Sequence, residues 1–257
     1  MLNRSGLLLV GHGTRDSRGI AEFLRLADAV ASLVPDVEAC FLELAEPTIA
    51  QAVVKFVERG VHDLTVMPVL LFAAGHARRD IPNAVAAACR PFHDLLVAQA
   101  SHLGCHSLVL ELSAERFKEA LQDKAPMPAS DTLLLLVGRG SLDDAATAEM
   151  HCFSRLRGEL TPVGRVDACF IAMARPSVTE ALGVVSRPPY RRVVVQPHLL
   201  FEGELLANLR RQVAEHATSD PQREWIVAPH LGVSPKLGAA IVEIAAAADA
   251  SMALRLS

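Results

Sequence analysis

The fold is decided by the stretch LLLVGHGT at residues 7–14, because the chain repeats it as LLLVGRGS at residues 134–141. A second stretch behaves in the same way: ACFLELAEP at residues 39–47 returns as ACFIAMARP at residues 168–176. Two shorter matches follow in the same order, VMP at 66–68 with VQP at 195–197 and HLG at 102–104 with HLG at 230–232. Matches that keep one order along the chain indicate an internal repeat.

The repeat predicts two domains, an N-terminal one over residues 1–123 and a C-terminal one over residues 131–257. Each copy has the size of an ordinary domain and can bury a core of its own. The stretch between them, KAPMPAS at residues 124–130, has the composition of a linker.

Within the first copy, short apolar runs alternate with longer segments of helical period. The expected strands lie at residues 6–11, 37–44, 63–70 and 94–100, and the expected helices at residues 17–34, 47–59, 80–90 and 107–122. This alternation predicts an α/β fold in which each copy is a mostly parallel sheet flanked by helices. Ligands of such sheets bind at the carboxyl ends of the strands, so we expect the site there, in a cleft between the two copies.

Composition narrows the possible partners. Hydrophobic residues make up 51% of the chain and charged residues 21%, which excludes a disordered protein. The net charge of −4 provides no basic field, so we expect no nucleic-acid partner. No apolar run approaches the roughly 18 residues of a membrane span, and no secretory cleavage pattern is visible. We therefore expect a cytoplasmic monomer that does not bind membranes. The five cysteines form no C-x-x-C pair, which argues against an iron–sulfur cluster.

Three potential metal ligands follow three of the predicted strands. His12 comes directly after the first strand, Glu43 ends the second, and His76 follows the third. Two imidazoles and one carboxylate suit a borderline divalent cation that keeps open coordination positions. The alternative is that His12 caps a turn and His76 is an ordinary loop histidine.

The second copy provides an internal control for this set. It has Arg139 in place of His12, Ala172 in place of Glu43 and, with one residue deleted, Glu204 in place of His76. All three candidate ligands change together while the apolar framework stays. This pattern favours the metal interpretation, with one active and one supporting half.

Three stretches together resemble the signatures of a known family. They are LVGHGTR at residues 9–15, FLELAEPTI at residues 41–49 and FAAGHARRDIP at residues 72–82. Each is similar to a motif of the CbiX/SirB family, the sirohydrochlorin cobalto- and ferrochelatases. The resemblance covers essentially the whole chain in the long form of the family, and it implies two tandem class II chelatase-like domains that act without ATP.

The same resemblance implies that His12, Glu43 and His76 hold the incoming Fe²⁺ or Co²⁺. The metal would be a substrate, with no permanent cofactor, and the product would serve sirohaem or cobalamin biosynthesis. A free-base tetrapyrrole loses two pyrrole protons as the metal enters, so a base is needed beside the ring. Glu43 or a neutral imidazole can accept a proton at neutral pH.

Sirohydrochlorin is a polycarboxylate, so an acidic enzyme must bind it with local cations. Arginine forks match carboxylates bidentately. The candidate substrate-binding residues are Arg15, Arg18, Arg78, Arg79 and Arg139, with Arg175 as a further cation of the second copy. The alternative for each is a solvated helix-start or loop residue, except at Arg139, which occupies the position of His12.

Two other functions remain open from the sequence. A non-catalytic protein that delivers a metal or a tetrapyrrole could keep the histidine pair without needing a base. A histidine-type phosphatase is less well supported, because Gly11 stands where the phosphate-binding arginine of its motif would be.

Overall fold

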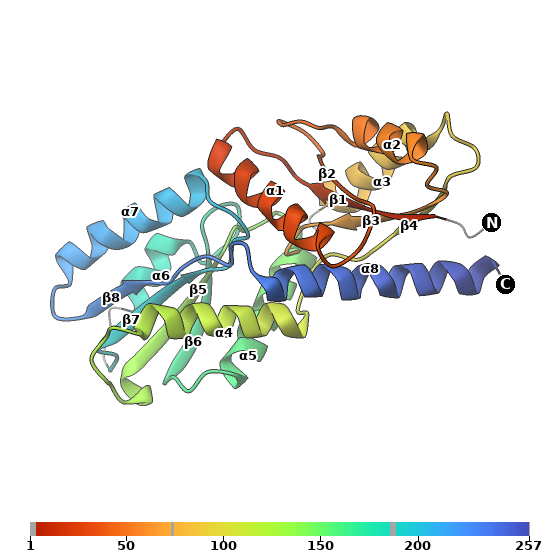
Figure 1. Ribbon diagram of the computed structural model, residues 1–257. Coiled ribbons are helices and arrows are strands. Elements are labelled where there is room, and N and C mark those ends of the chain that lie inside the picture. The colour runs from red at the N-terminus through yellow and green to blue at the C-terminus, as the bar shows by residue number, and fades with distance from the viewer. Residues whose placement is uncertain (1–3, 73–74, 186–188, 257) are drawn as a thin grey trace. The chain divides into compact units, whose positions relative to one another are not determined.

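The computed structural model describes residues 4–72, 75–185 and 189–256, without the side chains of residues 75–77 and 251–256. The chain forms two compact units (Figure 1). Unit 1 comprises Met1–Leu108 with Val233–Ser257, and unit 2 comprises Val109–Gly232.

Unit 1 contains a sheet of four strands in the order β2-β1-β3-β4, and all neighbouring strands are parallel. The strands are β1 (Ser5–Gly11), β2 (Val37–Phe41), β3 (Asp63–Pro68) and β4 (Leu96–Gln99). The helices are α1 (Ser17–Ala31), α2 (Ile49–Glu58), α3 (Gly75–Cys89) and α8 (Pro235–Leu256). Leu8 and Val10 of β1 are fully buried in one core with α2 and α3. Such continuous apolar strands are typical of a parallel sheet covered on both faces.

Unit 2 repeats this arrangement with the strand order β6-β5-β7-β8, again all parallel. Its strands are β5 (Thr132–Gly138), β6 (Arg165–Phe170), β7 (Arg192–Pro197) and β8 (Glu224–Val227), preceded by the short 3-10 helix η1 (Ala129–Asp131). Its helices are α4 (Ser107–Leu121), α5 (Asp144–Glu159), α6 (Val178–Val185) and α7 (Glu204–Ser219). The predicted α/β fold is confirmed, with two parallel sheets of one topology, one for each copy of the repeat.

The compact units differ from the predicted domains 1–123 and 131–257 in their last helices. Most of α4 belongs to unit 2, where the hydroxyl of Ser113 accepts a hydrogen bond from Nε of Arg157 at 3.0 Å. Helix α8 belongs to unit 1, where the hydroxyl of Thr65 in β3 donates to Asp249. The last helix of each sequence repeat thus packs in the unit that holds most of the other repeat. The amphipathic pattern of a helix predicts that one of its faces is buried, but it does not predict which sheet covers that face.

Helix α3 begins earlier than the sequence predicts, at Gly75 rather than near residue 80. Pro82 lies inside the helix, although proline is most common in a first turn because it lacks an N–H donor. The residues before Pro82 are helical, which places His76 in the first turn of α3 and not in a loop. Among the helices that the structure describes, none is long and apolar enough to cross a membrane.

Candidate metal centre

His12 and Glu43 lie side by side at the carboxyl ends of two neighbouring strands. Nε2 of His12 is 3.4 Å from Oε1 of Glu43, and both side chains are partly exposed to solvent. The backbone fixes this approach, because the N–H of Glu43 donates to the carbonyl of His12 at 3.2 Å. Leu44, the next residue, has a positive φ of 64°, so the chain turns sharply directly after the carboxylate.

Gly13 is required by the same close approach. Its φ is +97°, and a Cβ at this position would lie 1.7 Å from the carbonyl oxygen of Glu43. The absence of a side chain at Gly13 lets the loop after β1 and the loop after β2 meet. The second repeat has the same arrangement, because Gly140 has a φ of +89° and a Cβ there would also lie 1.7 Å from a carbonyl oxygen, that of Ala172. The sequence signal for this requirement is the glycine at both positions.

The third predicted ligand, His76, lies in the first turn of α3, and its side chain is outside the described residues. Because β1 lies between β2 and β3, the carboxyl ends of the three strands that precede these residues are adjacent. Within the described part of the chain, no three His, Cys, Asp or Glu side chains come together as a metal site. The structure therefore brings together two of the three predicted ligands and does not describe the third side chain.

Unit 2 keeps the framework of this site without its ligands. The N–H of Ala172 donates to the carbonyl of Arg139 at 2.9 Å, as Glu43 does to His12 in unit 1. Helix α7 begins at Glu204 directly after Gly203, and Gly75-His76 begins α3 in the corresponding way. The three equivalent positions hold a guanidinium, a methyl group and a carboxylate, and this set does not resemble a site for a borderline divalent cation.

The arginines predicted to bind substrate differ in whether a carboxylate of the chain already pairs with them. Arg15, Arg78, Arg79 and Arg139 are all exposed. Arg18 is held by Asp16, which accepts from its Nη2 at 2.8 Å and also caps α1. Arg175 is paired with Glu180. Sequence reasoning missed the role of Asp16, although an aspartate two residues before an arginine at a helix start suggests such a pair.

Among the titratable groups near this edge of the sheet, Asp16 has the most clearly shifted pKa. The hydrogen bonds from the side chain and the backbone of Arg18 lower the pKa of its carboxyl group to about 2.

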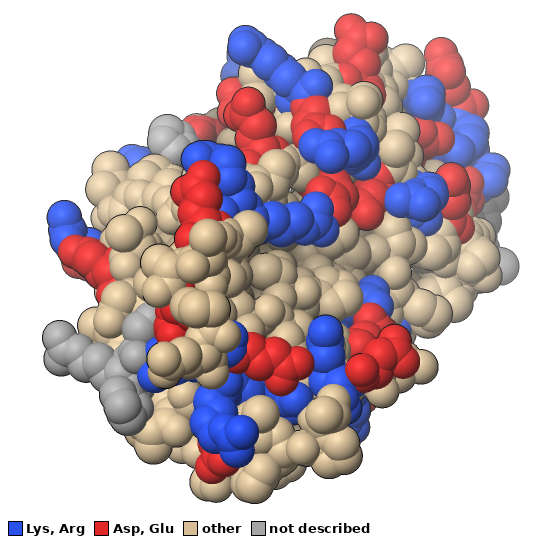
Figure 2. All heavy atoms as spheres, turned by 90° about the vertical axis from the view of Figure 1, so that its left-hand side faces the viewer, with Lys and Arg blue, Asp and Glu red and all other residues tan. Residues whose placement is uncertain are grey.

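The surface in Figure 2 carries acidic and basic side chains close to one another, in agreement with the small net charge of the chain.

Residues 6–120 and residues 133–248 each match the family model of CbiX. The chain belongs to the CbiX family. Two curated relatives come from Priestia megaterium. A sirohydrochlorin ferrochelatase is 32% identical over 228 residues, covering 88% of this CbiX chain and 84% of the relative. A sirohydrochlorin cobaltochelatase is 31% identical over 234 residues, covering 90% of this chain and 76% of the relative.

Solved structures agree with this CbiX assignment. SirB from Bacillus subtilis with Fe³⁺ superposes with a TM-score of 0.84 at 25% identity, covering 94% of each chain. The sirohydrochlorin chelatase SirB from Bacillus subtilis subspecies spizizenii in complex with cobalt gives a TM-score of 0.79 at 26% identity, again over 94% of each chain. The family and the fold implied by the sequence motifs are thus confirmed.

Proposed function

We propose that this protein inserts a divalent metal ion, Fe²⁺ or Co²⁺, into sirohydrochlorin without ATP, in sirohaem or cobalamin biosynthesis. The observation that carries the proposal is the 3.4 Å approach of His12 to Glu43 at adjacent strand ends of one repeat. The other repeat keeps the strand ends and has lost both side chains. Curated relatives that cover most of the chain are sirohydrochlorin chelatases for iron and for cobalt.

In this proposal His12, Glu43 and His76 hold the metal, which is a substrate and not a resident cofactor. A ligand set of two imidazoles and one carboxylate leaves coordination positions open for the ring nitrogens. Since His12 and Glu43 are both partly exposed, the ion can enter and leave without passing through the core. Such a site binds the ion long enough to present it and weakly enough to release it.

The two pyrrole protons need an acceptor close to the metal. Glu43 is suited to accept one of them, because a carboxylate is a common general base and this one lies beside the metal-binding imidazole. As the ion moves from the protein to the ring, Glu43 loses a ligand role and becomes available as a base. Glu43 can thus act first as a ligand and then as the base for one pyrrole proton, and the second proton passes to an imidazole that the ion has left or to water.

The macrocycle carboxylates are proposed to bind Arg15, Arg78, Arg79 and Arg139. All four are exposed, and a guanidinium offers two parallel N–H groups to a carboxylate. Arg18 is the weakest of the predicted candidates, because Asp16 already neutralises its charge. We place the reaction in the cytoplasm, supported by five cysteines that are all free thiols, as is usual in a reducing compartment.

An anaerobic absorbance assay tests this function. Sirohydrochlorin is incubated with Fe²⁺, Co²⁺ or Ni²⁺ in turn, with and without the protein, and the spectral change of metal insertion is followed. Catalysed insertion of iron or cobalt at sub-stoichiometric protein supports the proposal. A protein that binds metal or macrocycle without accelerating insertion is a delivery protein, and this result would overturn the proposal.

A further inference from the structure

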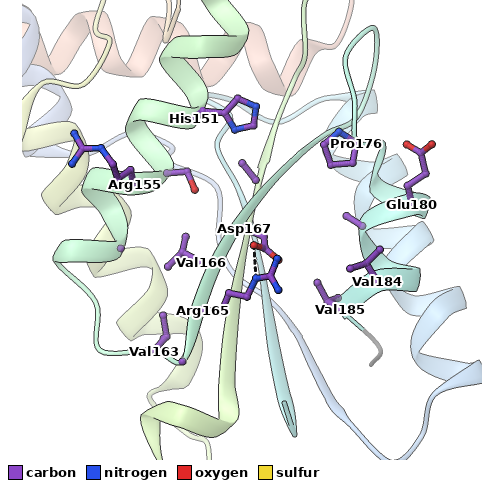
Figure 3. A pocket seen from close by; sticks show the side chains of 15 residues that line it. His151, Arg155, Val163, Arg165, Val166, Asp167, Pro176, Glu180, Val184 and Val185 are labelled. Carbon is purple, nitrogen blue, oxygen red and sulfur yellow. Dashed lines mark hydrogen bonds and ion pairs between the residues drawn. The ribbon is translucent and has the colours of Figure 1, made fainter. Parts of the chain in front are cut away.

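One edge of the sheet in unit 2 borders a groove. β6 is the end strand of the order β6-β5-β7-β8, and no other strand of the described residues pairs with its outer side. A groove of about 730 Å³ runs along this strand, lined by residues of β6, α5 and α6. Figure 3 shows Arg155 of α5 and Val184 of α6 on opposite sides, with the hydrogen-bonded pair of Arg165 and Asp167 between them.

The backbone of β6 presents hydrogen-bonding groups to this groove. The N–H of Ile171 donates to Gly138 of β5 at 3.0 Å, whereas the N–H of Phe170 donates away from β5, to Pro176 at 2.9 Å. Successive residues of a strand point their backbone groups to opposite sides. Val166 and Ala168 therefore point their N–H and C=O groups in the same direction as Phe170, and both residues line the groove.

The equivalent edge in unit 1 is covered by basic side chains. Nζ of Lys55 in α2 lies 3.2 Å from Glu38 of β2, and Nη1 of Arg59 lies 3.0 Å from the same carboxylate. Long charged side chains over a strand edge prevent another strand from pairing with it.

Unit 2 has lost part of this cover. Lys55 is the seventh residue of α2, and the seventh residue of α6 is Val184, whose side chain is 50% exposed. The two helices are otherwise alike, because the buried positions of α2 (Ile49, Ala52, Val53 and Phe56) correspond to those of α6 (Val178, Ala181, Leu182 and Val185). An apolar side chain thus faces solvent where the first repeat has a lysine.

We propose that β6 pairs antiparallel with β6 of a second copy of this chain, so that two copies join edge to edge about Val166. The sequence GRVDA at residues 164–168 is complementary to itself in this register. Arg165 of each copy lies opposite Asp167 of the other, and opposite charges directly across an antiparallel pair are stabilising. Moving the centre to Asp167 would place two carboxylates opposite each other, so the charges select the register about Val166. This dimer replaces the monomer expected from the sequence, and it does not depend on the proposed function.

Charge exchange tests the pairing in the full-length protein. We expect light scattering after size exclusion to give twice the mass of one chain, with a shift toward one chain on dilution and at high salt. Arg165→Asp alone and Asp167→Arg alone each place like charges across the pair, so both variants lose the dimer. An equimolar mixture of the two single variants recovers it, because each charge again meets its opposite, and the double variant Arg165→Asp/Asp167→Arg also recovers it.

Val184→Lys provides an independent test, because it restores the residue that covers the edge in unit 1. This variant is expected to be a monomer with unchanged thermal stability, and Val54→Lys on the 42% exposed position of α2 is the matched control that remains dimeric. Wild-type protein with the mass of one chain at every concentration would overturn the proposal. So would a dimer that survives both single charge reversals, since its interface would then lie elsewhere.

Discussion

Nε2 of His12 and Oε1 of Glu43 lie 3.4 Å apart, although 30 residues of chain separate them and each follows a different strand. The approach is set by the backbone, through the hydrogen bond from the N–H of Glu43 to the carbonyl of His12 and through the glycine that makes room for it. Substitutions of either side chain should therefore change the chemistry of the site without disturbing the fold.

The first prediction concerns Glu43→Gln. The amide keeps the shape of the side chain but loses its charge and its basicity, so metal insertion should slow by at least about tenfold, or about 1.4 kcal/mol in the barrier. The dependence of the insertion rate on pH should also change, because the carboxylate that accepts the proton is absent from the variant. Glu46→Gln, three residues further on and also exposed, is the matched control and should behave as wild type. An unchanged pH profile in Glu43→Gln would show that the base lies elsewhere.

The second prediction concerns Arg139, which occupies the position of His12 in the second repeat. Arg139→Ala should weaken sirohydrochlorin binding by about tenfold, while metal binding measured without the macrocycle and the urea midpoint stay the same. Arg211→Ala removes another exposed arginine of unit 2 and should leave all three quantities unchanged. If Arg139→Ala lowers stability and leaves affinity intact, Arg139 is a structural residue of a vestigial site.

The repeat allowed much of the fold to be predicted. The runs LLLV at residues 7–10 and 134–137 are fully apolar, and all these residues are buried, as a parallel sheet with two covered faces requires. What the sequence could not show is which sheet each terminal helix covers. Ser113 lies in the first repeat, but its hydroxyl and carbonyl accept hydrogen bonds from Arg157 and Gln196 of the second. Hydrogen bonds between residues so far apart in the chain produce no periodic pattern in the sequence.

The candidate site was predictable in position and less so in detail. His12 and Glu43 were predicted from their places at strand ends, from their joint loss in the second repeat and from the family resemblance, and the structure brings them together. The metal-ligand role of His76 stays a prediction, and its expected loop is the first turn of a helix. Arg18 was selected because it is basic and close to the motif, whereas its partner Asp16 is a side-chain contact that spacing suggests but does not establish.

The third prediction follows from Asp16. Its folded-state pKa of about 2 lies below the ordinary value of 3.8, so its contribution to stability is present above about pH 4 and is lost as the pH falls toward 2. Asp16→Asn keeps a capping oxygen and removes the titration. Urea unfolding across this range should therefore show a smaller loss of stability on acidification for Asp16→Asn than for wild type. If stability falls equally in both proteins, the pKa of Asp16 is the same in the folded and the unfolded state, which would contradict the prediction.

The fourth prediction concerns Arg157 of α5, whose guanidinium is buried although the charged residues near it in the sequence suggest an exposed helix surface. Its side chain is fully buried, donates from Nε to the hydroxyl of Ser113 at 3.0 Å and from Nη2 to the carbonyl of Ser113 at 3.1 Å, and also hydrogen-bonds to Thr161. Burial lowers the pKa of Arg157 to about 10, so the group stays charged at neutral pH.

Arg157→Ala removes these hydrogen bonds and leaves a cavity, so it should lower the free energy of unfolding by about 3 kcal/mol. Arg157→Met fills most of the space and avoids burying a charge, so its loss should be smaller. Arg211→Ala, at an exposed position of α7 in the same unit, should change stability by no more than about 0.5 kcal/mol. Hydrogen exchange adds a local measurement: because Ser113 belongs to α4, Arg157→Ala should speed exchange of the α4 amides more than those of α8. Equal effects on the two helices would show that Arg157 stabilises the chain as a whole and does not fasten α4 to its sheet.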